Sequence, residues 1–171
     1  MKPRFAVLAL IAALLTGCGF HLRGALNLPE HLGPVRVLAS DSNSPLGDLL
    51  ARELRRAGAQ PATVQDGENV ATLQVISEYW ADTPVSHDAL GRAQEYMLRY
   101  AVVFTLRRAD GSVAVPQQAV ELSRDYLTPV FDSVGKLSER ERLVAELQRD
   151  MATAILRRVD AASAPPADVV Q

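Results

Sequence analysis

Three neighbouring residues, Ser86, His87 and Asp88, have the side-chain types of a hydrolase triad. Consecutive residues in an extended segment point in different directions, so these three do not form a line of nucleophile, base and orienting carboxylate. The sequence also contains no nucleophile elbow, no phosphate-binding glycine loop and no paired-histidine zinc motif. We therefore predict that the protein is not an enzyme and that these residues form a polar turn between two strands.

Cys18 is the only cysteine, and the chain has only three histidines, so a structural zinc site or an intrachain disulfide is not expected. We predict no metal and no cofactor. Leu15, Thr16 and Gly17 precede the cysteine in the order of a bacterial lipobox, one aliphatic and two small residues. Small side chains let the backbone enter a peptidase cleft, and the thiol accepts a diacylglycerol group. The alternative is a secreted protein with a chance cysteine near its cleavage site.

The residues before Cys18 have the layout of a secretory signal. Lys2 and Arg4 are basic, and the 11 residues from 5 to 15 are all apolar. As a helix this run would span roughly 16 Å, too short for a hydrocarbon core of about 30 Å. We predict that residues 1–17 are removed and that lipid on Cys18 holds the protein on a membrane without crossing it. In bacterial lipoproteins, an aspartate directly after the lipidated cysteine tends to retain the protein in the inner membrane. Gly19 occupies that position here and therefore favours the outer membrane.

The charge balance excludes one class of partner. The net charge is −2, and removing residues 1–17 takes away two basic residues and no acidic one, leaving −4. A nucleic-acid-binding module is strongly basic, so nucleic acid is not an expected partner.

Basic side chains are the remaining candidates for chemistry. Guanidinium groups pair bidentately with phosphate, and four arginines fall on or near the predicted strands: Arg92, Arg99, Arg107 and Arg124. The alternative is a set of salt bridges on a solvated face of the sheet.

Lys136 differs from these arginines because it is the only lysine after residue 17. It comes just before Ser138, which with Glu141 matches a capping box at the start of a helix. A helix N-terminus attracts anions, so Lys136 and the free amides there could hold a phosphate. The alternative is an exposed lysine in a loop.

The elements that must position these residues follow from periodicity. Residues 35–39 form a short apolar run, and residues 93–108 alternate between apolar and polar side chains. Asp110 and Gly111 indicate a hairpin that leads, through Pro116, to a strand at 117–127. Another strand is expected at 71–81, before these two in the chain, with Leu73, Val75, Ser77 and Tyr79 on one face. We expect the carboxylates of Glu78 and of Asp82, just beyond the strand, to be solvated.

Two amphipathic helices complete the prediction. The first spans about 45–57, with Ser44 as N-cap, Pro45 in the first turn and Gly58 as its stop. The second begins after Ser138 and buries residues at helical spacing, namely Leu143, Leu147, Met151, Ala154, Ile155 and Val159.

This order predicts an α/β (α+β) sandwich. A four-stranded mixed sheet, largely an antiparallel meander, carries both helices on one face, and its other face is open or covered by another molecule. We assign residues 18–33 to a lipidated tether, 34–160 to the domain and 161–171 to a disordered tail.

The segment from Cys18 to Gly24, Cys-Gly-Phe-His-Leu-Arg-Gly, resembles the mature start of the LptE family of lipopolysaccharide-assembly lipoproteins. The likeness continues in the first helix, which ends in Arg-Arg-Ala-Gly, in the Gln-Glu-Tyr at residues 94–96 and in the long C-terminal helix. It covers nearly the whole mature chain, although beyond the first seven residues it rests mainly on the order and length of the elements.

The resemblance implies a non-catalytic lipoprotein on the periplasmic face of the outer membrane. It implies a one-to-one complex in which the chain plugs the LptD β-barrel, supports its assembly and binds lipopolysaccharide during insertion into the outer leaflet. Lys136 and then Arg92 correspond to regions implicated in lipopolysaccharide contact, although the match at Arg92 is displaced. Two alternatives remain: an outer-membrane lipoprotein adaptor that activates a periplasmic cell-wall enzyme, and a lipid-anchored hydrolase using residues 86–88.

Overall fold

The computed structural model describes residues 33–62, 66–67, 70–127 and 133–163. The predicted signal segment, Cys18 and nearly all of the predicted tether lie outside these residues. The elements in chain order are β1 (Val35–Leu38), α2 (Pro45–Arg56), β2 (Ala71–His87), β3 (Ala93–Arg107), β4 (Val113–Leu127) and α3 (Ser133–Ser163).

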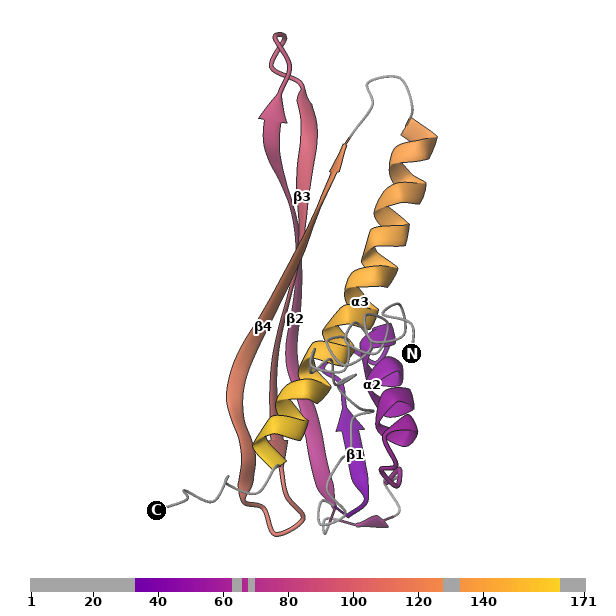
Figure 1. The fold of residues 1–171 in the computed structure, drawn as a ribbon, viewed down its shortest axis with the longest axis vertical. Helices are drawn as coiled ribbons and strands as arrows, with labels where there is room; N and C mark the ends of the chain where they lie inside the picture. The colour runs from indigo at the N-terminus through magenta and orange to yellow at the C-terminus, as the bar shows by residue number, and fades with distance from the viewer. Residues whose placement is uncertain (1–32, 63–65, 68–69, 128–132, 164–171) are drawn as a thin grey trace, which may run out of the picture.

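The four strands form one mixed sheet in the order β1-β2-β3-β4. β1 runs parallel to β2, with Val35 opposite Ala71, and the other two pairings are antiparallel. Both helices lie on the same face of the sheet (Figure 1). The predicted fold class is therefore confirmed, and the sheet order, which the sequence did not give, follows the chain.

The first helix begins and ends where the sequence predicts. The Ser44 hydroxyl accepts a hydrogen bond from the Leu46 amide, and Pro45 occupies the first turn. Gly58 has φ +87°, and its amide bonds to the Arg55 carbonyl while the Ala59 amide bonds to the Leu54 carbonyl. These two bonds form a Schellman motif, which requires a residue such as glycine in the left-handed conformation.

A β-bulge changes the face assignment that we predict for β2. The register with β3 shifts between Val75 and Ser77, so Ile76 is an extra residue in the ladder. One extra residue moves every later side chain to the opposite face. Leu73 and Val75 therefore lie in the core, but beyond the bulge it is Glu78 that turns toward the helices, while Tyr79 is 60% exposed on the outer face.

The apolar core fills the half of the molecule that contains β1 and α2. In β3 every second side chain is buried from Leu98 to Leu106, as the alternation predicts. Both helices contribute a row of buried residues to this core: Leu46, Leu50, Leu54, Leu143, Leu147, Met151, Ile155 and Val159. Burying one such side chain is worth about 1.5–3 kcal/mol, so this half carries most of the folding energy.

Several predicted boundaries are wrong. β2, expected at 71–81, continues to His87. α3 begins at Ser133, so Ser138 lies inside the helix and the predicted capping box is not a cap. Gly135 is the one poor helix former in the added turn, and a single glycine costs only about 1 kcal/mol. β4 begins at Val113 rather than 117, and Pro116 lies within it, which an edge strand tolerates because one row of its N–H groups is unpaired.

α3 continues to Ser163, and the rest of the predicted tail lies outside the described residues. Within the part of the chain that the structure describes, no helix is long and apolar enough to cross a membrane.

Candidate functional site

The sheet is longer than its apolar core, and its far end carries the predicted binding residues. The β2–β3 hairpin projects beyond the end of β4, and α3 starts at the same end of the molecule (Figure 1). We call this the distal end: residues 83–97, residues 125–127 and the first turns of α3. The basal end holds the β3–β4 turn, β1 and the last turns of α3.

Asp88 organises the turn at the distal tip. Its Oδ1 accepts hydrogen bonds from the amides of Leu90 (2.8 Å) and Arg92 (2.9 Å). Its Oδ2 accepts from Nε of Arg92 at 2.7 Å. These bonds, that of the Arg92 amide first, hold the pKa of Asp88 at about 2. The Asp88 side chain is thus engaged by the turn. The predicted polar turn holds for Asp88 alone, because Ser86 and His87 are the last two residues of β2 and pair with β3.

Arg92 is held on one side and open on the other. Only its Nε bonds to Asp88, and its side chain is 53% exposed. Its two Nη atoms form no hydrogen bond with any residue that the structure describes. A guanidinium in this position has a fixed stem and a free pair of donors, which is the arrangement that binds a phosphate bidentately.

Lys136 lies in the first turn of α3, at the same end of the molecule as Arg92. The earlier start of the helix changes its setting, because it is now the fourth helical residue and not a residue before the cap. Lys136 still lies in the turn that contains the N-terminal amides of the helix, so the anion site there stays a prediction.

A half-buried cluster of hydrogen bonds around Asp82 holds α3 against the sheet. Asp82 Oδ2 accepts two hydrogen bonds from Arg140, from Nε at 3.0 Å and Nη2 at 2.7 Å. Its Oδ1 accepts from the Tyr126 hydroxyl at 2.9 Å. Burial and then the bond to Asp82 raise the pKa of Tyr126 to about 12. Asp82, expected to be solvated, instead joins three elements.

Glu78 is a second carboxylate that joins elements and not a solvated group. Its Oε2 accepts hydrogen bonds from the Ser44 hydroxyl at 2.8 Å and from the Tyr100 hydroxyl. Burial and then the bond to Glu78 raise the pKa of Tyr100 far above its ordinary value. Trp80 stacks on Tyr100 with ring centroids 3.8 Å apart. The bulge at Ile76 creates this cluster, and no sequence signal marks that bulge.

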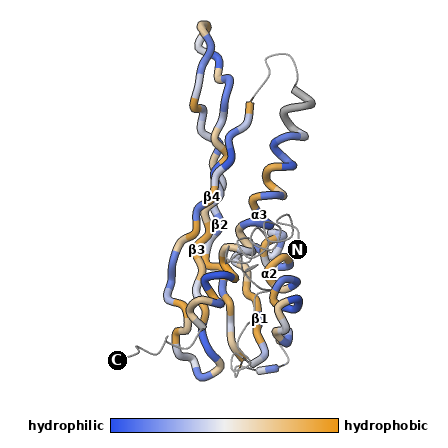
Figure 2. Tube along the Cα trace, in the orientation of Figure 1, coloured by the Kyte–Doolittle hydropathy of each residue, from blue (hydrophilic) through white to orange (hydrophobic). Residues whose placement is uncertain are grey.

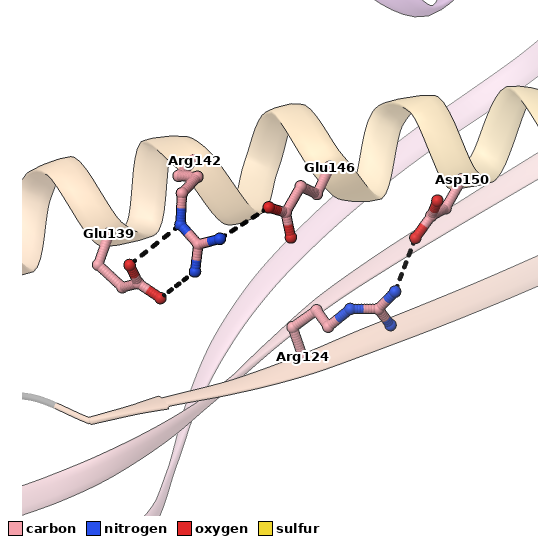
Figure 3. A network of polar contacts seen from close by, with 5 residues as sticks. All are labelled: Arg124, Glu139, Arg142, Glu146 and Asp150. Carbon is pink, nitrogen blue, oxygen red and sulfur yellow. Dashed lines mark hydrogen bonds and ion pairs between the residues drawn. The ribbon is translucent and has the colours of Figure 1, made fainter.

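The arginines do not form one basic patch. Arg124 reaches across to Asp150 of α3 at 2.6 Å, and Arg142 lies between Glu139 and Glu146 on the same helix (Figure 3). Arg99 lies on the outer face of the sheet, 3.7 Å from Glu121. The predicted salt bridge on a solvated face of the sheet therefore holds for Arg99, whereas Arg124 pairs with a helix on the other face. Arg107 lies exposed at the basal end of β3. Among the described residues no group of histidine, cysteine or acidic side chains could hold a metal.

A family model described as LptE, lipopolysaccharide-assembly, matches residues 32–159. The chain is 29% identical over 162 residues to the LPS-assembly lipoprotein LptE of Photorhabdus laumondii, covering 93% of this chain and 87% of that one.

Two solved structures have a similar fold. The solution structure of lipoprotein B from Nitrosomonas europaea matches with a TM-score of 0.69 and 26% identity, over 84% of this chain and 91% of that chain. The crystal structure of rare lipoprotein B from Shewanella oneidensis matches with a TM-score of 0.66 over 75% of this chain and 95% of that chain, and its 24% identity speaks for the fold alone.

Proposed function

This chain belongs to the LptE family, and from that premise we propose that it binds lipopolysaccharide at its distal end while it plugs a β-barrel of the LptD type. The observation that carries the proposal is the match of the lipopolysaccharide-assembly family across residues 32–159, which includes every strand, α2 and all but the last turn of α3. The role is binding and support of barrel assembly, not catalysis.

The proposed anchor is a lipid on Cys18, placing the domain on the periplasmic face of the outer membrane after removal of residues 1–17. The names of the relatives, which call them lipoproteins, support this assignment. About 14 residues separate Cys18 from the first described residue, Gly33. An extended segment of that length spans up to about 50 Å, enough to let the domain enter a barrel while its lipid stays in the membrane.

Lys136 and Arg92 are the proposed lipopolysaccharide-binding residues. They are 44 positions apart in sequence, and the fold brings both to the distal end. Lipopolysaccharide carries phosphates. The Nη atoms of Arg92, which bond to none of the described residues, and the helix start near Lys136 suit anions.

The outer face of the sheet is the proposed surface for the barrel partner. Neither helix covers it (Figure 1). Apart from Tyr79 and the Arg99–Glu121 pair, its central positions carry small side chains: Ser77, Ala81, Ala101, Val103, Ala119 and Ser123. A surface of small residues allows close approach of another chain, and the net charge of −4 suits a polar lumen better than a lipid surface.

A charge-reversal titration tests the binding site. Each basic residue near an anionic lipid surface contributes about 1 kcal/mol, so Lys136→Asp should weaken lipopolysaccharide binding roughly thirtyfold. Arg157→Asp makes the same change in charge at an exposed position near the other end of α3 and should have little effect. Equal binding by the wild type and Lys136→Asp would remove Lys136 from the site. Arg92→Gln should weaken binding by less.

A mild-detergent pull-down from the native host, with a tag after Gln171, tests the partner. The proposal predicts a stoichiometric partner whose electrophoretic mobility shifts on heating, as that of a β-barrel does. Recovery of a soluble peptidoglycan enzyme instead would replace this function with the adaptor alternative.

A further inference from the structure

The two β-hairpins of the meander end in turns of the same geometry. In the distal turn, residues 88–92, the Asp88 amide bonds to the Arg92 carbonyl at 2.8 Å and the Gly91 amide to the Asp88 carbonyl at 2.9 Å. In the basal turn, residues 108–112, the corresponding bonds also measure 2.8 and 2.9 Å. The glycines at the fourth position have φ +76° and +81°. Each turn is a type I turn closed by a left-handed glycine.

The third residue of each turn is chemically different. The basal turn has Asp110, whose Oδ1 accepts a hydrogen bond from the Ser112 amide at 2.8 Å. The distal turn has Leu90, which is 77% exposed and packs against no core residue. Because the same turn forms with aspartate at this position, the backbone does not require leucine there.

Leu90 shares the distal end with two other exposed apolar residues. Six large apolar residues are exposed in the described part of the chain, and the two most exposed, Leu90 and Leu127 at 69%, both lie at the distal end. Val85, near the end of β2, is 45% exposed and also lies at the distal end. The shaft of the hairpin is mainly hydrophilic and its tip turns toward the hydrophobic end of the colour scale (Figure 2). One such residue alone would mean little, but three at a projecting end need an explanation.

We propose that Leu90 inserts between hydrocarbon chains of an acylated anionic lipid, while Arg92 stays at the level of its phosphates. This rests on the proposed function and assigns the acyl chains of lipopolysaccharide as the occupant. Leu90 lies two residues from a half-exposed guanidinium, on a turn fixed by five hydrogen bonds that involve Asp88. This arrangement matches a molecule with phosphate and hydrocarbon side by side. An apolar pocket in a partner protein would bury the Leu90 side chain but would offer no anion to the Nη atoms of Arg92.

The test compares two lipopolysaccharide preparations, one intact and one chemically stripped of all its acyl chains but keeping its phosphates and sugars. The full mature lipoprotein is titrated with each, as the wild type, as Leu90→Asn and as the control Asp110→Asn. Asparagine is neutral, so the charge at the tip is unchanged. Leu90→Asn should weaken binding of the intact lipid about tenfold to hundredfold, the value of burying one leucine, and leave binding of the stripped form unchanged. Asp110→Asn should bind both as the wild type does.

The outcomes separate the two proposals. Equal binding of intact lipid by the wild type and Leu90→Asn would overturn this inference while the lipopolysaccharide site stands. Binding of neither preparation by the wild type would instead overturn the proposed function. If Leu90→Asn bound lipid normally but no longer copurified with the barrel, the occupant would be a protein pocket and the inference would be wrong. Unchanged melting temperatures would establish that both variants are folded.

Discussion

The basal and distal ends of the sheet are built from the same three strands but are held together differently. At the basal end β3 buries one whole face, with Phe104 and Leu106 enclosed by both layers. At the distal end the same face carries polar and aromatic residues, and hydrogen bonds of Asp82 take the place of apolar packing. The basal end therefore supplies most of the stability. The distal end has less apolar packing and instead presents the exposed surface that we propose for lipid binding.

The largest effect should come from the basal core. Phe104→Ala removes a fully buried ring and should lower the free energy of unfolding by about 3–5 kcal/mol. The matched distal change, Leu90→Ala, should alter it by less than about 0.5 kcal/mol because Leu90 is exposed. Urea denaturation of the mature domain measures both. Comparable losses for the two variants would contradict the division between the ends.

The next effect concerns the contact that holds α3 against the distal sheet. Asp82→Ala leaves Arg140 and the Tyr126 hydroxyl without their shared acceptor and should cost about 2 kcal/mol. Glu121→Ala, which breaks the exposed pair with Arg99 on the outer face, should cost less than about 0.5 kcal/mol. The same denaturation assay checks this, and a larger loss for Glu121→Ala would refute it.

Alkaline pH should weaken the distal contact in a defined range. The pKa of Tyr126 is about 12 in the fold, against about 10 in the unfolded chain. Between these values the unfolded chain loses the proton and the folded chain keeps it, so stability falls as the pH rises from 10 to 12. Tyr126→Phe should flatten that decline while costing about 1 kcal/mol at neutral pH. A decline of the same steepness in both proteins would show that Tyr126 does not contribute.

The smallest effect should follow acidification of the distal turn. A carboxylate with a lowered pKa contributes stability above its ordinary value of about 4, and that contribution is lost as the pH falls toward 2. Binding that depends on the Asp88–Arg92 contact should therefore be insensitive to pH between 5 and 8. A loss of Arg92-dependent binding within that range would point to a different titrating group.

Local sequence patterns predicted most of the fold. Ser44, Pro45 and Gly58 marked the limits of α2, and Asp110 with Gly111 marked the basal turn, because caps and turns depend on neighbours in sequence. The alternation of β3 identified its buried face because the bulge near Ile76 inserts its extra residue into β2. The residues of β3 from Leu98 to Val103 pair with β2 without interruption.

What could not be predicted depends on contacts between distant elements. The bulge at Ile76 reversed the faces of β2, and with them the surroundings of Glu78 and Asp82. Ser138 matched a capping box, yet the helix continued past it to Ser133. Arg92 and Lys136 were predicted as binding residues from their charge and their place near a strand and a helix start, and then from a family resemblance. Their presence at one end follows from the length of the hairpin and of α3.

Hydrogen exchange of the full mature lipoprotein, with and without lipopolysaccharide, tests the division between the two ends most directly. The account predicts slower exchange on binding in residues 83–97 and in the first turns of α3, with no change in the basal strand segments around Phe104 and Val115. Protection confined to the basal end, or spread evenly along the sheet, would contradict it.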